Sequence, residues 1–395
     1  MTSFMLRSAT GSPRRSTHPR RFLFAMLFAL GLPLSASALA ESKLDPILAA
    51  VMEGTQTPAM AMLVIRDGKI EQQSARGVRR NDGAVAVQLD DVWLMGSTGK
   101  PMTSALIARL VEQGVLDWNA SLSRMLPDLV KIDPAYRNVT LVQLLSHRAG
   151  LPENLADVAA LDAYFTDTRA LPVQREAYIR AALQEAPVNV PGTEFAYSNS
   201  GFLIAAVIAE RATGISFEDL MQREVFKPLG MDGAGFGPTP SGQPQGHRAG
   251  KPVTTAPRKS DDGVPAMYTP AGNMHMRLQD MAKFAIDQME GSRGKGKLLS
   301  AASYRMMQTP QSGSPSAMDW GVQPSIAGRK GPVLTHGGSD GNWLAWVALF
   351  PETGNGLIAI ANAAEDMGAD KATMGAMGAV FPELAPAAAA TTPAK

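Results

Sequence analysis

Cysteine is absent from the 395 residues of the chain. This absence excludes disulfide bonds, thiolate metal sites, a cysteine nucleophile and a lipid-modified N-terminal cysteine. A dominant charge is also missing, since 37 lysines and arginines face 36 acidic residues and leave a formal net charge of +1. Such a balance gives no electrostatic reason to expect a nucleic acid or an anionic membrane as a partner. The histidines after residue 40 (His147, His247, His275, His336) are too scattered for metal-ligand spacing, so we expect no metal and no other cofactor.

Hydrophobic runs long enough to cross a membrane are missing as well. The apolar run from Phe22 to Leu34 has thirteen residues, whereas a spanning helix needs about 20. It follows an arginine-rich start and precedes a small-x-small site at Ala38-Leu39-Ala40, which is the pattern of a secretory signal peptide rather than of an anchor. We therefore predict that residues 1–40 are cleaved, that the protein is periplasmic or secreted, and that the mature chain has no stable membrane span. Arg20-Arg21 loosely resembles a twin-arginine signal, so both export routes stay open.

The rest of the chain has a globular composition, with 45% hydrophobic and 18% charged residues overall. Loss of the five arginines of the leader would change the formal charge from +1 to −4. We predict one large domain over residues 41–384, followed by an Ala/Pro/Thr-rich and disordered tail, 385–395. The sequence does not indicate an oligomeric state.

Strand-like segments lie at both ends of this domain. Near its start, Met60 to Arg66 and Lys69 to Arg76 flank Asp67-Gly68, a two-residue hairpin signal. Near its end, three further strand-like segments follow one another: 332–335, 343–350 and 357–362.

The middle of the chain instead has apolar residues at helical spacing, in segments 103–113, 141–146, 201–211, 216–225 and 280–290. We therefore predict an α+β fold, in which both chain ends form one antiparallel sheet (about 44–96 and 300–382). A mostly helical lobe (about 97–299) would complete it, with a cleft between the two parts.

Two literal motif matches fail on their context. Gly337 to Gly341 spells the G-x-S-x-G nucleophile elbow, but a strand rather than a helix is expected after it, and no histidine follows His336. Gly291 to Lys297 spells most of a phosphate-binding loop, but Leu298 stands where the hydroxyl should be, and a helix precedes the loop.

Three other segments could carry chemistry together, although each has an ordinary alternative. Ser97 and Lys100 are spaced i, i+3; if Ser97 opens a helix, the amine can reach its hydroxyl, and the helix N-terminus offers free N–H groups to an oxyanion. Taken alone, Ser97 is more simply explained as a helix cap.

Tyr197 and Asn199 lie on one side of an extended segment before a helix. We expect a nearby ammonium group to lower the pKa of the Tyr197 phenol, which would let it relay protons, although a buried loop tyrosine is commonplace.

The third segment is His336-Gly337-Gly338-Ser339, at the end of a predicted strand. Its glycines would allow the backbone to approach a ligand closely, and the N–H that follows could be a second oxyanion donor. A histidine at a strand end is more often only a satisfied polar residue.

In this order and spacing the three segments resemble the penicillin-recognising serine hydrolases: class C β-lactamases, D-alanyl-D-alanine carboxypeptidases, D-aminopeptidases and family VIII carboxylesterases. Leu141 to Pro152 resembles the family's LLSH-x-x-GLP segment and Phe226 to Met231 its PLGM segment, so the resemblance covers about residues 44–382. It implies that Ser97 is the nucleophile of an acyl-enzyme, Lys100 its base and Tyr197 a proton relay. The substrate-binding residues that it implies are Asn199, His336, Gly338 and Ser339, with the backbone N–H groups of Ser97 and Ser339 as the oxyanion hole.

One departure affects the predicted substrate. Where class C β-lactamases have Lys-Thr-Gly, this chain has His336-Gly337-Gly338, and a histidine of ordinary pKa is mostly neutral at pH 7.5. Weaker attraction for anionic β-lactams follows. We therefore predict a hydrolase of esters or of amides in D-amino-acid peptides, with a small molecule or peptide as partner. The alternatives are a β-lactamase proper and a non-catalytic protein that binds cell-wall peptides.

Overall fold

The computed structural model describes residues 42–129, 131–253, 263–312 and 314–388. The signal peptide predicted for 1–40 lies outside these ranges, and so does most of the predicted tail, so both stay predictions. Within the described ranges no single helix combines the length and hydropathy that a bilayer crossing requires, although Asn199–Thr213 and Phe217–Leu229 pass that test together as a pair bent by 85°.

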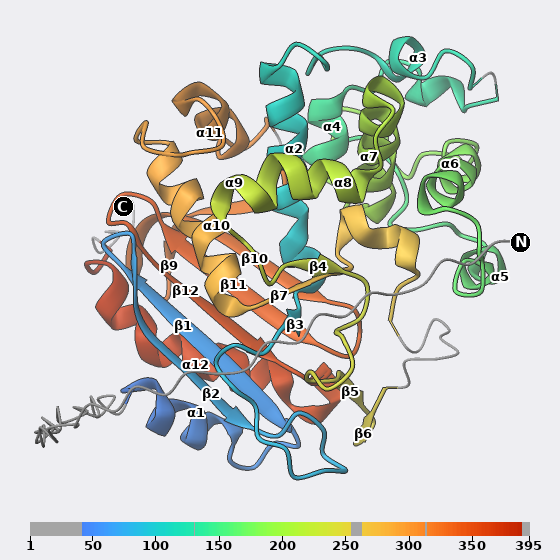
Figure 1. Ribbon diagram of the computed structural model, residues 1–395. Helices are drawn as coiled ribbons and strands as arrows, with labels where there is room; N and C mark the ends of the chain where they lie inside the picture. The colour runs from blue at the N-terminus through green and yellow to red at the C-terminus, as the bar shows by residue number, and fades with distance from the viewer. Residues whose placement is uncertain (1–41, 130, 254–262, 313, 389–395) are drawn as a thin grey trace, which may run out of the picture. The chain divides into compact units, whose positions relative to one another are not determined.

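A seven-stranded antiparallel sheet joins the two ends of the described chain in the order β2-β1-β12-β11-β10-β9-β8 (Figure 1). Its strands are β1 (Ala59–Arg66), β2 (Lys69–Gly77), β8 (Ser316–Ala317), β9 (Trp320–Ile326), β10 (Arg329–Ser339), β11 (Leu344–Phe350) and β12 (Asn355–Ala361). The first and last strands of the chain lie side by side, with Met60 opposite Ala361 and Ile65 opposite Gly356. The predicted α+β class and the pairing of the chain ends are thus confirmed.

Strand β1, the second strand of the sheet, is buried on both faces. Met60, Met62 and Val64 pack into a core under α1 (Leu44–Met52) and α12 (Ala369–Leu384). The alternate residues, Ala61 and Leu63 among them, belong to a larger core shared with the helices of the middle of the chain. This is the two-residue period of a strand with an apolar layer on each side.

Helices dominate the middle of the chain, as the apolar spacing predicted. They are α2 (Lys100–Glu112), α3 (Leu122–Met125), α4 (Leu141–Leu145), α5 (Val158–Ala163), α6 (Leu171–Ala182), α7 (Asn199–Thr213), α8 (Phe217–Met221), α9 (Lys227–Leu229), α10 (Leu278–Gly291) and α11 (Ala301–Met307). A π-helix, Gln222–Phe226, joins α8 to α9, and 3-10 turns occupy Gly96–Gly99, Pro134–Tyr136, Ala266–Ala271 and Glu365–Met367. Two small sheets complete the fold: β3 (Trp93–Leu94) with β7 (Met274–Met276) and β4 (Gly235–Phe236), and β5 (His247–Arg248) with β6 (Lys251–Pro252).

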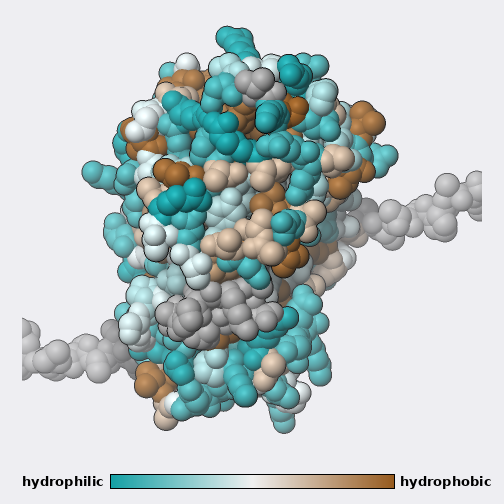
Figure 2. Space-filling view, turned by 90° about the vertical axis from the view of Figure 1, so that its right-hand side faces the viewer, coloured by the Kyte–Doolittle hydropathy of each residue, from teal (hydrophilic) through white to brown (hydrophobic). Residues whose placement is uncertain are grey.

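Helix α7 lies at the centre of this helical part, since its residues 200–210 are all buried. Ser198 caps its first turn by accepting the Gly201 N–H at 3.3 Å, and Gly214 ends it in the left-handed conformation that glycine tolerates (φ 70°). On the outer face shown in Figure 2, apolar residues form small patches among hydrophilic ones. Isolated exposed apolar residues such as Val158 and Val173 are normal on a protein surface.

The end of β10 differs from the prediction in length. A short strand was expected at 332–335, but β10 continues to Ser339 and runs directly past the turn that carries Ser97. The next element after Gly341 is strand β11, which begins at Leu344, and not a helix; this agrees with the rejection of the nucleophile elbow.

Candidate active site

Ser97 lies on the 3-10 turn Gly96–Gly99, between β3 and α2. This differs from the expectation that Ser97 would open the α-helix, because α2 begins at Lys100. In a 3-10 turn the side chains of residues i and i+3 eclipse one another, so Lys100 stands directly beside Ser97. Pro101 fits the first turn of α2, where its missing N–H leaves no intrahelical bond unmade.

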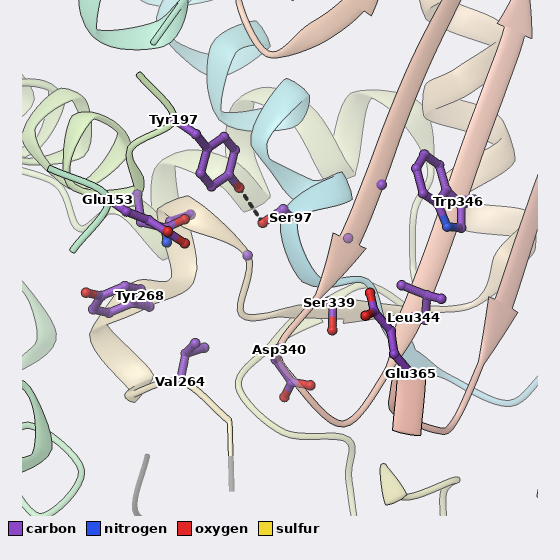
Figure 3. A pocket seen from close by; sticks show the side chains of 15 residues that line it. Ser97, Glu153, Tyr197, Val264, Tyr268, Ser339, Asp340, Leu344, Trp346 and Glu365 are labelled. Carbon is purple, nitrogen blue, oxygen red and sulfur yellow. Dashed lines mark hydrogen bonds between the residues drawn. The ribbon is translucent and has the colours of Figure 1, made fainter. Parts of the chain in front are cut away.

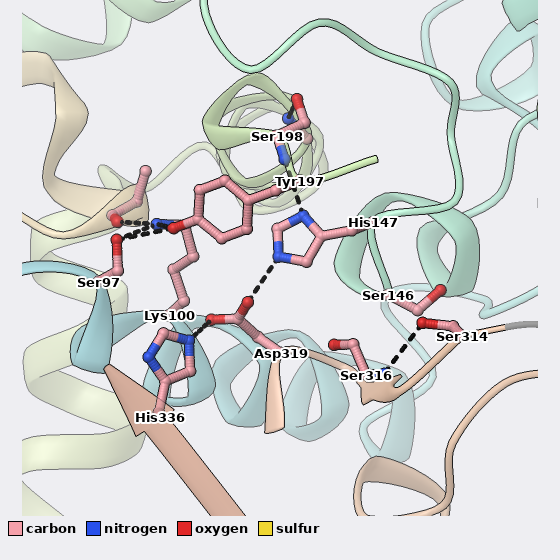
Figure 4. A network of polar contacts seen from close by, with 12 residues as sticks. Ser97, Lys100, Ser146, His147, Tyr197, Ser198, Ser314, Ser316, Asp319 and His336 are labelled. Atoms are coloured by element: carbon pink, nitrogen blue, oxygen red, sulfur yellow. Dashed lines mark hydrogen bonds and ion pairs between the residues drawn. The ribbon is translucent and has the colours of Figure 1, made fainter. Parts of the chain in front are cut away.

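Three side chains form a closed triangle of hydrogen bonds (Figure 4). The Lys100 Nζ lies 2.7 Å from the Ser97 Oγ and 2.6 Å from the Tyr197 hydroxyl, and that hydroxyl lies 2.8 Å from the Ser97 Oγ. The carbonyl oxygen of Ala271 is a further acceptor for the amine. All three partners of the amine are neutral oxygens, and no carboxylate lies at contact distance from it in the described part of the chain.

Burial dominates the protonation of both partners of Ser97. The Lys100 side chain has no solvent exposure, and burial lowers its pKa to about 8, against the charges of Asp319 and Glu153, which raise it. An amine with that pKa is partly unprotonated near neutral pH and can accept a proton.

For Tyr197 the expected direction was wrong. Burial, assisted by the negative charge of Asp319, raises the pKa of the phenol in spite of its hydrogen bond to Ser97. The Tyr197 hydroxyl therefore keeps its proton, and it can act as a donor or pass a proton on.

Glycines let the end of β10 touch the serine turn. A Cβ atom at Gly338 would lie 2.4 Å from the Met95 carbonyl oxygen and 2.9 Å from the Ser97 nitrogen. A Cβ at Gly96, whose φ is +53°, would lie 2.5 Å from the Ser339 nitrogen. Only residues without a side chain allow this approach, and it brings the backbone nitrogens of Ser97 and Ser339 to the same small region.

Asn199 begins α7, and its amide is held by residues that carry no sequence signal. Its Nδ2 donates to the Asn154 Oδ1 at 3.0 Å, and the same oxygen accepts the Tyr268 hydroxyl at 3.1 Å. Glu153, next to Asn154, accepts the Asn199 N–H with its backbone carbonyl at 2.8 Å. Sequence analysis missed Glu153, Asn154 and Tyr268 because their loops match no motif.

These residues surround a cavity of about 360 Å³ (Figure 3). Ser97, Tyr197, Asn199, Gly338 and Ser339 all line it, so five of the predicted site residues share one hollow.

His336 lies apart from them, against a neighbouring cavity of about 300 Å³ that shares Tyr197, Gly337 and Trp346 with the first. Its ring nitrogens face acceptors inside the protein, the Gly337 carbonyl and the Asp319 carboxylate, each at 2.6 Å. His336 is not among the residues that line the cavity at Ser97.

Within the described ranges, no group of three or more His, Asp or Glu side chains is placed to hold a metal ion. The expectation that the protein needs no cofactor remains a prediction.

Comparison with known proteins finds relatives along most of the chain. A family model described as Beta-lactamase matches residues 44–378. The D-alanyl-D-alanine-carboxypeptidase/endopeptidase AmpH of Escherichia coli K12 is 26% identical over 339 residues, which cover 83% of this chain and 85% of that protein. Penicillin-binding protein 4 of Amycolatopsis lactamdurans is 27% identical over 318 residues, or 76% and 79% of the two chains.

Solved structures share the fold at lower identity. The octameric penicillin-binding protein homologue from Pyrococcus abyssi superposes with a TM-score of 0.69 at 22% identity, over 87% of this chain and 78% of that one. A D-stereospecific amidohydrolase from Streptomyces sp. gives a TM-score of 0.66 at 21% identity, over 87% and 98%.

Proposed function

The chain belongs to the Beta-lactamase family, and from that premise we propose that it is a serine hydrolase in which Ser97 attacks an ester or amide carbonyl and forms an acyl-enzyme. The observation that carries the proposal is the hydrogen-bonded triangle of Ser97, Lys100 and Tyr197. A serine hydroxyl is a weak nucleophile until a neighbour removes its proton. The buried amine, with its pKa lowered to about 8, is chemically suited to that task.

The proposed reaction has two halves. In the first, neutral Lys100 takes the Ser97 proton, and the Oγ bonds to the substrate carbonyl carbon. The N–H groups of Ser97 and Ser339 hold the resulting oxyanion, each worth about 3 kcal/mol of barrier. The Tyr197 hydroxyl passes a proton to the leaving alcohol or amine, and is reprotonated through Lys100.

In the second half, water replaces the leaving group. It gives a proton to the same pair and attacks the acyl-enzyme, and the bond between the acyl carbon and the Ser97 Oγ breaks, with the proton returned to Ser97. Asn199 and Gly338 line the cavity beside Ser97, where the acyl part of the substrate would bind.

The charges around the cavity support neutral or cationic substrates over anionic ones. Its charged lining residues in the described part of the chain are Glu153, Asp340 and Glu365, all acidic. The ring of His336 is engaged by Asp319 and cannot replace the free lysine of a β-lactamase. The name of the relative from E. coli, a carboxypeptidase and endopeptidase for D-alanyl-D-alanine, further supports amides next to D-amino acids.

The test is covalent labelling followed by a substrate panel. A fluorophosphonate should add to Ser97, as located by mass spectrometry, and the label should vanish in Ser97→Ala. Purified enzyme should hydrolyse short acyl esters or a D-Ala-D-Ala peptide faster than nitrocefin. Faster nitrocefin turnover would make the protein a β-lactamase proper, and the absence of both label and turnover would favour the non-catalytic binding protein.

We further propose that the enzyme acts in the periplasm or outside the cell after cleavage behind Ala40. N-terminal sequencing of the exported protein should begin at Glu41. A mature protein that retains Phe22 to Leu34 would contradict this.

A further inference from the structure

A buried carboxylate joins two histidines from distant parts of the chain. Asp319 lies in the turn between β8 and β9. One of its carboxylate oxygens is hydrogen-bonded to the His147 Nε2 and the other to the His336 Nε2, both at 2.6 Å. In Figure 4 it stands between the two rings, beneath the triangle at Ser97. The three side chains are nearly inaccessible, with exposed fractions of 1% for His147, 2% for Asp319 and 8% for His336.

The neighbours of the rings determine where the protons sit. The Nδ1 of His147 accepts the Ser198 N–H at 3.0 Å and must carry a lone pair, so its proton is on Nε2, directed at Asp319. His336 faces the Gly337 carbonyl with Nδ1 and Asp319 with Nε2, and both partners are pure acceptors. Satisfying both needs a doubly protonated, positively charged ring, which corrects the mostly neutral ring expected from the sequence.

The acidities agree with this assignment. Burial lowers the pKa of His147, which keeps that ring neutral. Burial raises the pKa of Asp319, but the charge of His336 and the hydrogen bonds from both rings lower it by more. The carboxylate is therefore ionised.

His147 in turn fixes Tyr197 through two hydrogen bonds to the backbone on either side of it and through one ring contact. Its backbone carbonyl accepts the Ala196 N–H at 2.8 Å, and its Nδ1 accepts the Ser198 N–H, so both residues flanking Tyr197 are fixed. The two rings pack with centroids 4.5 Å apart at 33°. The position of the Tyr197 hydroxyl at Ser97 therefore depends on the orientation and tautomer of His147.

We propose that Asp319 is a positioning residue for the hydrolytic reaction. It fixes the tautomer of His147, which places the Tyr197 phenol at Ser97. Through the charged ring of His336 it also anchors the β10 segment that passes the serine turn. The inference rests on the proposed function, because it assigns Asp319 a part in the chemistry at Ser97.

Asp319→Asn tests this assignment with a small steric change. Its amide oxygen can still accept the His147 proton, but its NH₂ group faces His336 Nε2, which must give up its proton to accept that group. The chain has five histidines in total, so selectively ¹⁵N-labelled rings can be assigned by single substitutions. In the wild type we expect His147 with a proton on Nε2 alone and His336 with protons on both nitrogens; in Asp319→Asn, His336 should keep only its Nδ1 proton.

Kinetics test the effect on the reaction. A misplacement of about 1 Å at a reacting group can cost about 10²-fold in rate, so we expect Asp319→Ala to lower kcat of ester hydrolysis by about 10²-fold and Asp319→Asn by about 10-fold. KM should change by less than about twofold, because Asp319 does not line the cavity at Ser97. Asp287→Asn is a matched control: Asp287 is also a buried carboxylate, bonded to the Tyr304 hydroxyl away from the site, and its loss should leave kcat unchanged.

A double variant separates positioning from general damage. Asp319→Ala removes the contacts with both rings. Adding it to Tyr197→Phe should lower kcat by about 10-fold rather than about 10²-fold, because only the effect through His336 is left to lose. A wild-type His147 ring protonated on Nδ1, an unchanged kcat in folded Asp319→Asn, or a full additional 10²-fold loss from Asp319→Ala in the Tyr197→Phe background would each overturn the proposal. The ¹⁵N spectra of the wild type and of Asp319→Asn do not depend on activity. They report the protonation of both rings even if Asp319→Ala does not fold. A wild type without Ser97 labelling or turnover would instead refute the proposed function.

Discussion

Lys100 and Arg175 are both cationic side chains without solvent exposure, and their surroundings are opposite. Arg175, on α6, meets two carboxylates: its Nη2 lies 2.5 Å from the Glu210 Oε1 on α7 and 2.8 Å from the Glu218 Oε2 on α8. Burial lowers the pKa of Arg175, but the hydrogen bonds and charges of Glu218 and Glu210 outweigh it and raise the pKa. Lys100 meets only neutral oxygens, and its pKa falls to about 8.

The difference separates a structural cation from a reactive one. A buried charge with matched counter-charges is retained and ties three helices together, whereas a buried amine without them gains a usable lone pair. The comparison predicts that changing Lys100 destroys activity with little effect on folding, and that changing Arg175 does the reverse.

The largest effect is expected at Lys100. Replacement by Met removes the proton acceptor and should lower kcat/KM for ester hydrolysis by about 10³-fold. Lys100→Arg should be as inactive, because a guanidinium stays protonated and cannot accept the serine proton. Steady-state kinetics on protein with native circular dichroism would check this, and substantial activity in Lys100→Arg would mean that only a positive charge is needed.

The next effect is expected at Arg175. Arg175→Met leaves the carboxylates of buried Glu210 and half-buried Glu218 without their cationic partner, which should lower the free energy of unfolding by about 3–5 kcal/mol. Urea denaturation measures this, and kcat/KM per folded molecule should stay at the wild-type value. Adding Glu210→Gln and Glu218→Gln should restore part of the stability; if it restores none, the loss comes from packing rather than from unpaired charge.

The smallest effect concerns stability at high pH. In the unfolded chain Lys100 returns to its ordinary pKa of 10.5, so between about pH 8 and 10.5 the unfolded state binds a proton that the folded state does not. Stability from this residue therefore rises with pH across that window. Relative to Lys100→Met, the wild type should gain about 2 kcal/mol of unfolding free energy between pH 7.5 and 10. A constant difference would mean that the amine is not desolvated.

Sequence reasoning succeeded where the signal is local or periodic. The Ser97–Lys100 spacing, the Tyr197–Asn199 pair and the glycines after His336 are short patterns, and the strands and helices follow from their apolar periods. The placement of five of these residues around one cavity agrees with the reasoning from motif order.

Sequence reasoning failed where the structure depends on packing between segments that are distant in the chain. Asp319 lies 172 residues from His147, and nothing in Ala317-Met318-Asp319-Trp320 indicates a shared hydrogen bond. The pKa direction of Tyr197 was wrong because the neighbouring amine was visible in the motif, whereas the depth of burial was not.

The central claim is that Lys100 is a neutral base for Ser97 near physiological pH, and the pH dependence of Ser97 labelling tests it most directly. The rate of fluorophosphonate addition, followed by intact-protein mass spectrometry, should rise about tenfold per pH unit below a midpoint near 8 and level off above it. A rate that is flat from about pH 6 to 9, or a midpoint near the ordinary lysine value of about 10.4, would contradict the account.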